Sequence, residues 1–265
     1  MSIKRLVDIM AELRDPEHGC PWDREQVLES LVPYTIEEAY EVADSIARGD
    51  MEELCGELGD LLFQVVFYAR IASEQGQFDM QDVIDGICEK MVRRHPHVFG
   101  DQSVADAQEQ SLVWEQLKAQ ERQNRAGERT VSHLDGIAQA LPALLRAGKL
   151  QKRAAKVGFD WPESSQVLEK VKEELQELEA ELQGPQRDQA RIAEEMGDLL
   201  FSCVNLSRHL GLEAEGLLRS ANSKFETRFN AMETTLLRRG VTLESATLSV
   251  MDATWDEIKQ KEADE

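Results

Sequence analysis

EELQELEAELQGPQRDQARIAEEMGD, residues 173–198, holds two acidic patterns, Glu-Glu-x-x-Glu and Glu-x-x-Asp, on either side of a Gly-Pro pair. Gly and Pro interrupt helices, so the stretch predicts two helices with a short link, which makes them antiparallel neighbours. At about 100° per residue, the acids of each pattern share one face of their helix. We therefore expect four carboxylates to converge between the helices: Glu174, Glu177, Glu195 and Asp198.

The same pattern occurs a second time in residues 37–60, EEAYEVADSIARGDMEELCGELGD. The offset is 173 − 37 = 136 in the first half and 195 − 57 = 138 in the second, so the copies differ by a two-residue insertion. Its four corresponding acids are Glu38, Glu41, Glu57 and Asp60. Other residues repeat in the same order: Trp22 with Trp161, Lys90 and Arg94 with Lys224 and Arg228, Trp114 and Lys118 with Trp255 and Lys259.

These matches indicate an internal duplication into two tandem domains. We place the domains at residues 1–124 and 125–265, with a polar linker near residues 120–130. Apolar residues recur at steps of three and four almost throughout the chain, and alternating strand-like patterns are scarce. The predicted fold class is all-α, with two tandem helical bundles.

The charge of the chain limits its partners. Of 265 residues, 30 are basic and 51 acidic, giving a net charge of 30 − 51 = −21. This balance argues against nucleic acid or an anionic membrane as a partner, and a small anionic substrate would need a cation as mediator. The cysteines form no CxxC pair, and no apolar run is long enough to span a bilayer. We therefore expect a cytoplasmic protein with reduced thiols.

Clustered carboxylates are costly to bury unless cations compensate them. Oxygen ligands favour Mg²⁺, Mn²⁺ or Ca²⁺ over zinc, and the absence of a nearby histidine argues against a di-iron site. The alternative interpretation is a solvated acidic helix face. The apolar residues around Asp60 and Asp198, and the duplication itself, favour the metal site.

The doubled acidic pattern, followed by Lys-x-x-x-Arg and Trp-[Glu/Asp]-x-x-Lys, resembles the tandem-domain MazG-like nucleoside triphosphate pyrophosphohydrolases, of the all-α NTP pyrophosphatase group. The segments GCPWDREQ and SLVPYTIEEAYE strengthen the resemblance, which covers nearly the whole chain. It implies Mg²⁺-dependent hydrolysis of a broad range of nucleoside triphosphates to the monophosphate and diphosphate, with Mn²⁺ as an alternative metal. It also implies a homodimer, and a role in nucleotide-pool housekeeping or stress signalling.

The resemblance assigns roles to individual residues. It implies that the eight acids named above, Glu174, Glu177, Glu195 and Asp198 with Glu38, Glu41, Glu57 and Asp60, bind the metal. It implies that four residues approach the nucleotide: Lys224, Arg228, Trp255 and Lys259. For catalysis we expect Glu173 or its neighbour Glu174 to orient or deprotonate the attacking water, and Lys224, Arg228 and Lys259 to stabilise charge on the departing diphosphate.

The two copies differ beside their acids. Lys170, Lys172 and Arg191 of the second copy align with Tyr34, Ile36 and Glu53 of the first. The second copy therefore offers more positive charge to a triphosphate, and we expect it to be the principal catalytic site, with these three bases binding nucleotide. The alternative is that Lys170 and Arg191 merely pair with acids four residues away on their own helices.

Three further expectations complete the prediction. Pro96 should end a helix near Arg94, so that Arg94 is held less rigidly than Arg228. Trp22 and Trp161 should serve packing, and Trp114 and Trp255 either packing or base stacking. Two other functions stay open: a pyrophosphohydrolase with a narrow substrate, such as dUTP or phosphoribosyl-ATP, and a non-catalytic helical interaction protein.

Overall fold

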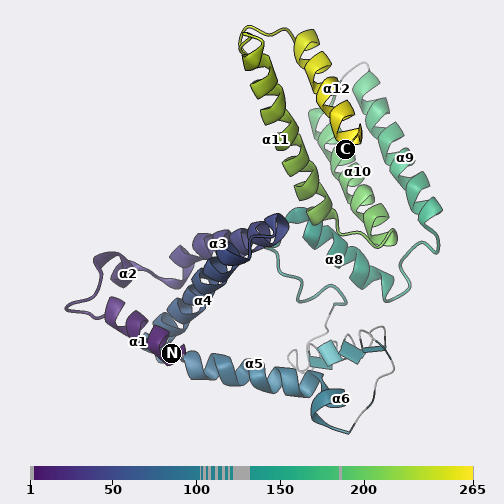
Figure 1. Cartoon of the computed structure of the whole chain (residues 1–265). Coiled ribbons are helices and arrows are strands. Elements are labelled where there is room, and N and C mark those ends of the chain that lie inside the picture. The colour runs from purple at the N-terminus through teal and green to yellow at the C-terminus, as the bar shows by residue number, and fades with distance from the viewer. Residues whose placement is uncertain are drawn as a thin grey trace. The chain divides into compact units, whose positions relative to one another are not determined.

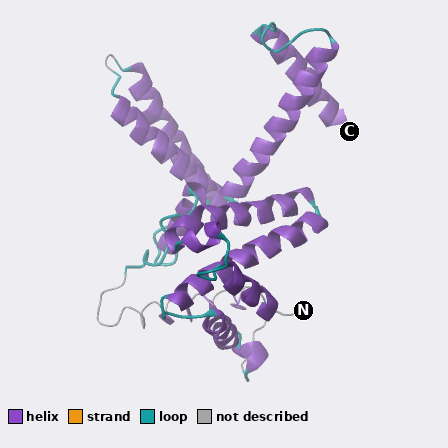
Figure 2. Ribbon diagram, turned by 90° about the vertical axis from the view of Figure 1, so that its left-hand side faces the viewer, coloured by secondary structure: helices purple, strands orange, loops and turns teal. Residues whose placement is uncertain are grey.

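The structure is a computed structural model, and it describes residues 3–264 except 102, 104–105, 107–108, 111–112, 115–116, 119, 122–131 and 185–186. The described residues form helices and no strands, as predicted (Figure 2). The chain divides into two compact units, residues 1–121 and 122–265. The linker and the boundary after residue 124 fall within residues 122–131, outside the described part, so they stay predictions.

The first unit is built around one helical hairpin, α3 (Leu28–Arg48) and α4 (Met51–Glu74) (Figure 1). Gly49 ends α3 in the left-handed conformation, at φ 70°, which glycine adopts without strain. The Asp50 carboxylate then caps α4 by accepting hydrogen bonds from the first-turn backbone N–H groups. The other helices of the unit with described bounds are α1 (Ile3–Leu13), α2 (Pro21–Glu25), α5 (Met80–Arg94) and α6 (Pro96–Phe99), and further helical residues lie among the partly described residues 109–121.

The core of the first unit lies where α1 packs against the hairpin. Met10 of α1, Leu31 of α3 and Phe67 of α4 are buried there. Trp22 adds its ring at this end, with centroids 5.7 Å from Tyr34 and 6.5 Å from Phe67, both edge to face. Such contacts between aromatic edges and faces fix the end of the hairpin from which α3 starts.

The second unit contains two helical hairpins (Figure 1). The first is α9 (Ser164–Gln183) with α10 (Gln189–His209), and α8 (Ala143–Ala155) packs against α10. The second is α11 (Ala214–Arg238) with α12 (Leu248–Asp264), which bury Met232, Leu236 and Ile258 between them. The break predicted at Gly184 falls between α9 and α10, and residues 158–162 and Gly240 also lie between helices.

Large apolar side chains cover much of the outside of these hairpins. Leu58 and Leu62 of α4, and Met196, Leu200 and Phe201 of α10, are exposed, although the sequence favoured an apolar environment around the acids. The reason is that an isolated helix pair buries only the seam between its helices and leaves the outer faces open. No described helix is long and apolar enough to cross a membrane.

Candidate metal centre and nucleotide site

In the second unit, three of the four predicted ligands meet between α9 and α10. Carboxylate oxygens of Glu174, Glu195 and Asp198 all lie within 4.8 Å of one another. Glu174 comes from α9 and is only 5% exposed, while Glu195 and Asp198 share one face of α10. A carboxylate buried beside two others is unfavourable unless a cation compensates it. The trio offers the oxygen donors that hard divalent cations prefer.

Glu177, the fourth predicted ligand, is outside this close trio but faces the same site. Desolvation raises the pKa of Glu177, and the charge of Glu174 raises it further. Lys170 lowers this pKa and Glu195 raises it, so the carboxyl is within electrostatic reach of both helices. Burial and the neighbouring carboxylates together produce this net rise.

Two bases lie at the edge of the trio. Lys170 Nζ is 2.8 Å from Glu173 Oε1 and 2.9 Å from Glu174 Oε1, and these hydrogen bonds raise the pKa of Lys170 well above its usual value. Arg191 pairs with Glu181 at 2.8 Å and lies 3.9 Å from Glu195. Lys170 and Arg191 therefore do lie close to acids four residues away on their own helices, Glu174 and Glu195, as the alternative interpretation of the sequence stated. It also holds Lys170 against a buried member of the trio.

Two other predicted residues of α9 point elsewhere. Lys172 pairs with Glu169 at 2.8 Å, and its side chain is more than half exposed. Glu173 is also more than half exposed, and it pairs with Lys170 rather than with a member of the trio. The described contacts thus bring neither residue to the carboxylates of α10.

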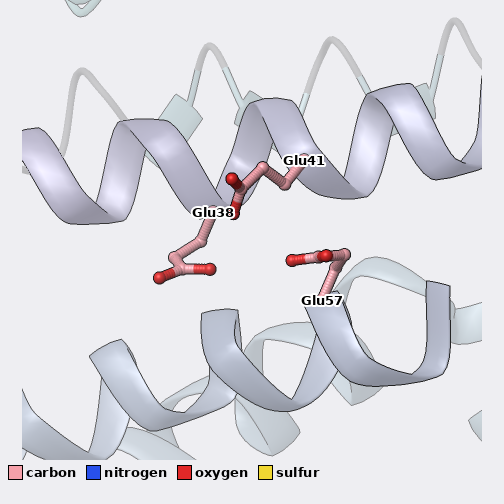
Figure 3. Close-up of side chains that lie close together, drawn as sticks. All are labelled: Glu38, Glu41 and Glu57. Carbon is pink, nitrogen blue, oxygen red and sulfur yellow. The ribbon is translucent and has the colours of Figure 1, made fainter. Parts of the chain in front are cut away.

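The first unit contains an equivalent cluster. Figure 3 shows Glu38 and Glu41 on α3 extending towards Glu57 on α4, and oxygens of the three lie within 4.8 Å of one another. Asp60 is outside this trio, yet after desolvation its charge is the largest contribution that raises the pKa of Glu38. Each hairpin thus gathers three acids closely with the fourth beside them. Asp60 is the fourth in the first copy, and Glu177 is the fourth in the second.

The remaining predicted nucleotide contacts lie on the other hairpin of the second unit. Lys224 and Arg228 are on α11, and Trp255 and Lys259 are on α12. Trp255 packs against Phe225, with ring centroids 5.4 Å apart, inside the apolar cluster of this hairpin. Figure 2 shows this hairpin, which carries the C-terminus, diverging from α9 and α10. Among the described residues, Arg228 pairs with Glu262 and Lys259 with Asp256, and neither base pairs with the acidic trio.

Both repeated arginines are held by a glutamate that was not predicted. Arg228 donates two hydrogen bonds to Glu262 Oε2, at 2.8 and 2.6 Å, and Arg94 donates to Glu121 Oε2 at 2.5 Å. The arginine side chains are 20% and 21% exposed. Helix α5 does end at Arg94, as predicted. Glu121 pairs with Arg94 as Glu262 pairs with Arg228, and the expectation that Arg94 is held less rigidly stays a prediction.

The sequence contains the signal for these glutamates. The offset 262 − 121 = 141 equals 255 − 114 = 141, the offset between Trp114 and Trp255. The repeated motif is therefore longer than Trp-[Glu/Asp]-x-x-Lys and ends in glutamate. In the first copy Trp114 also donates its ring N–H to the Arg94 carbonyl at 2.9 Å. Glu115, the acid of the first-copy motif, lies outside the described residues.

Comparison with known proteins agrees with the duplicated geometry. The family model of the MazG nucleotide pyrophosphohydrolase domain matches the chain twice, at residues 26–99 and 163–232. The chain belongs to this family. Both MazG segments contain a complete set of four acids, and the second also contains Lys224 and Arg228.

Three relatives of this MazG protein match nearly its whole length. It is 51% identical over 263 residues to the nucleoside triphosphate pyrophosphohydrolase of Escherichia coli K12, covering 99% of each chain. It is 44% identical to the nucleoside triphosphate pyrophosphohydrolase/pyrophosphatase MazG of Thermotoga maritima, covering 97% of this chain and 95% of that protein. The similarity to YabN of Bacillus subtilis is 44% and covers 51% of that longer protein.

Proposed function

We propose that this protein is a cytoplasmic, Mg²⁺-dependent nucleoside triphosphate pyrophosphohydrolase whose principal site is the second acidic cluster. The main support is the trio Glu174, Glu195 and Asp198, whose carboxylate oxygens lie within 4.8 Å of one another. Lys170 Nζ lies 2.9 Å from Oε1 of Glu174, the most buried of the three. Membership of the MazG family and the names of its full-length relatives supply the substrate class. The first cluster lacks a base equivalent to Lys170, since Tyr34 aligns there.

The residues present fit a hard divalent cation. All candidate ligands are carboxylates, which favours Mg²⁺, with Mn²⁺ as the alternative. Desolvation, and then the charges of neighbouring carboxylates, raise the pKa of Glu177 in the second copy and of Glu38 and Glu57 in the first, and a bound cation would offset both effects. In the second copy Glu174, Glu195 and Asp198 would hold the metal, with Glu177 beside them. The metal, when bound, would supply positive charge to the phosphoryl oxygens and make a water a better nucleophile.

The reaction adds water across the bond between the α and β phosphates. The water oxygen attacks the α-phosphorus, the bond to the bridging oxygen breaks, and diphosphate leaves with that oxygen. Glu173, exposed beside Lys170, is placed on the helix that carries Glu174 and would accept the proton of the water. Lys170 would bind a phosphate oxygen in exchange for one of its two carboxylate partners.

The bases of the second hairpin would neutralise the departing diphosphate. Lys224, Arg228 and Lys259 are exposed or half-buried on α11 and α12, and Arg228 can present two donors to one phosphate. In this proposal Lys172 of α9 and Arg191 of α10 add positive charge on the two helices that carry the trio. Trp255 keeps the hairpin packed, and its approach to the nucleotide remains a prediction from the resemblance.

We include a homodimer in the proposal. Met196, Leu200 and Phe201 on α10, and Phe225 and Phe229 on α11, are exposed apolar residues on long helices. Contiguous apolar helix faces of this kind mark association surfaces. A second copy is the partner that would cover both hairpins at once. Sedimentation velocity should give a dimer at micromolar concentration, and a monomer would contradict this part of the proposal.

Product analysis tests the proposed reaction. With an NTP panel, phosphorus NMR should show monophosphate and diphosphate in Mg²⁺ and no turnover in excess chelator. Glu195→Gln should lower the rate about 100-fold or more, because it removes a carboxylate that would hold the metal, and with it the positive charge at the phosphoryl oxygens. Glu57→Gln is the matched control, and it should retain most of the activity. Release of orthophosphate, or equal losses in both variants, would contradict the proposal.

A further inference from the structure

A cavity in the first unit lies between the last turn of α4, the loop that follows α1, and α2. Its volume is about 610 Å³, within the range of pockets that bind small molecules. Arg70, which lines it, follows Asp60 by ten residues on α4. At 1.5 Å per residue the cavity is therefore roughly 15 Å along the helix from the first acidic cluster. It is a separate place from the candidate metal centre.

The cavity is positively charged, although the chain is strongly acidic. Three arginines and two glutamates line it, giving 3 − 2 = +1, whereas the whole chain carries −21. Guanidinium groups present planar pairs of N–H donors that match phosphate and carboxylate oxygens. A complementary ligand of this cavity is an anion. The lining charges are Arg14, Arg24, Arg70, Glu25 and Glu74.

Arg14 and Glu74 form the fixed part of the wall. Arg14 Nε and Nη2 donate to the Glu74 carboxylate, at 3.0 and 2.7 Å. Arg14 Nη1 donates to the main-chain carbonyls of Asp23 and Gln26, and the Arg14 side chain is only 8% exposed. Burial would raise the pKa of Glu74, but hydrogen bonds from Arg14 and then Arg70 outweigh burial and lower it. The donors of Arg14 are thus used within the protein, and its charge is matched by Glu74.

Arg70 and Arg24 have donors left for a ligand. Arg70 donates to Glu74 through Nε at 2.7 Å, and its two terminal nitrogens have no hydrogen-bond partner among the described residues. Arg24 is exposed, and its side chain makes no hydrogen bond or ion pair within the described part of the chain. Two guanidinium groups with available N–H donors therefore border one cavity.

The loop after α1 holds the wall of the cavity in one shape. Asp15 Oδ1 accepts hydrogen bonds from the backbone N–H groups of Glu17 and His18, at 2.9 and 2.7 Å. A Cβ atom on Gly19 would lie 2.6 Å from the Asp15 carbonyl oxygen, so the loop closes this tightly only with glycine. The cavity is therefore formed before a ligand arrives, which lowers the entropy cost of binding.

We propose that this cavity binds a small ligand through a diphosphate group, held between Arg24 and Arg70. The site lies outside the proposed function, because it belongs to the first unit and needs no turnover. More than one negative charge is required, since Glu25 opposes an anion from the same wall. Phosphate is favoured over carboxylate because a terminal phosphate offers three acceptor oxygens, which two guanidinium groups can share. The diphosphate group is either free diphosphate or part of a nucleoside diphosphate.

Calorimetric titration of the full chain with sodium diphosphate tests the site. The titration is done in excess chelator, because carboxylate clusters without a cation repel anions and do not compete. Arg24→Gln and Arg70→Gln should each weaken binding about tenfold or more, the value of one charge-assisted hydrogen bond. Glu25→Gln should strengthen binding by up to about fivefold, because it removes an opposing charge. A structural role of these residues would not produce that gain.

Arg48→Gln is the matched control. Arg48 is an arginine of the same unit that pairs with Asp44 and Glu53 and does not line the cavity. The control should keep the affinity of the wild type for diphosphate. Far-UV circular dichroism of each variant should match the wild type, since Arg24 and Glu25 are exposed.

Further probes identify the source of the phosphate. ADP binding more tightly than diphosphate, with the same losses in Arg24→Gln and Arg70→Gln, supports a nucleoside diphosphate. Tighter binding of diphosphate supports the free anion. Tighter binding of malonate, a dicarboxylate, would overturn the assignment to phosphate. The site itself is overturned if neither phosphate probe binds saturably, or if both arginine variants bind like the wild type. The proposed function is tested separately, by diphosphate release in Mg²⁺.

Discussion

The two halves of this chain contain corresponding acids, but the residues around these acids differ. Both hairpins gather three carboxylates within 4.8 Å, and both hold an arginine with a glutamate from the following helical segment. In the first half, Trp22, Tyr34 and Phe67 fill the end of the hairpin with rings. In the second half, Lys170 and Asn205 stand where Tyr34 and Phe67 do.

This difference distinguishes the residues that would hold an ion from the residues that would bind a substrate. Acids on two facing helices are sufficient for a cation, and both copies keep them. A triphosphate additionally needs positive charge, and within the described residues the second copy places Lys170 beside its trio. The first copy has aromatic residues, Tyr34 and Phe67, at the positions of Lys170 and Asn205. We therefore expect changes in the first half to affect stability most, and changes in the second half to affect turnover.

The largest expected effect is on the core of the first half. Phe67→Ala should lower the free energy of unfolding by about 3–5 kcal/mol, since it leaves a cavity under a fully buried ring. The matched change Asn205→Ala should cost about 1–2 kcal/mol, through the lost hydrogen bonds to Arg208. Urea unfolding followed by circular dichroism measures both. Equal losses would mean that the two positions are packed alike.

Magnesium should stabilise both halves. At a concentration of 100 times its dissociation constant, an ion that binds only the folded chain adds about 2.7 kcal/mol per site. Melting curves in Mg²⁺ and in chelator should show this gain, and Glu57→Gln and Glu195→Gln should each remove part of it. A gain that survives either substitution in full would show that the corresponding hairpin binds no ion.

Removing the base beside the trio should affect turnover alone. Lys170→Met should lower kcat/KM for NTPs about tenfold, equivalent to about 1.4 kcal/mol, because one charge-assisted bond to phosphate is lost. Tyr34→Phe, at the aligned position of the first copy, should leave kcat/KM unchanged. Steady-state assays of diphosphate release measure both. An equal effect of the two changes would contradict the assignment of catalysis to the second copy.

The smallest expected effect is the pH dependence of the free energy of unfolding that comes from the ion pair between Arg94 and Glu121. Hydrogen bonds from Arg94 and then Arg93 lower the pKa of Glu121 from 4.5 to about 2. A lowered pKa in the folded state stabilises the protein above pH 4.5, and this contribution is lost as the pH falls towards 2. The stability difference between wild type and Glu121→Gln, less than about 1 kcal/mol for a pair near the surface, should therefore shrink over that range. Denaturant titrations at each pH measure this difference. A difference that grows on acidification would show that the ion pair with Glu121 does not stabilise the protein.

Much of the fold could be predicted because its signals are local. Gly49, Gly184 and Gly240 mark the ends of helices, and the acidic spacing places Glu174, Glu195 and Asp198 on facing sides of two helices. The tandem all-α arrangement and the MazG family follow from these patterns and are confirmed. Local periodicity and duplicated motifs are sufficient for such features.

The rest depends on how helices meet, which spacing does not report. Periodicity identifies Leu58 and Phe201 as apolar but does not indicate that one hairpin leaves them exposed. It does not place Lys224 and Arg228 on a hairpin that diverges from the acids. Nor does it show that Glu121 pairs with Arg94 as Glu262 pairs with Arg228, although the common offset of 141 contained that information.

The ion pair between Arg228 and Glu262 has a consequence for which phosphates can bind at Arg228. The guanidinium already has a carboxylate partner at 2.6 Å, so an incoming anion must compete with a single negative charge. A triphosphate tail carries more charge than the glutamate and can displace it. Once the diphosphate has left, no phosphate remains beside Arg228, so Glu262 can return to the arginine. The ion pair would thus oppose rebinding of the diphosphate after cleavage.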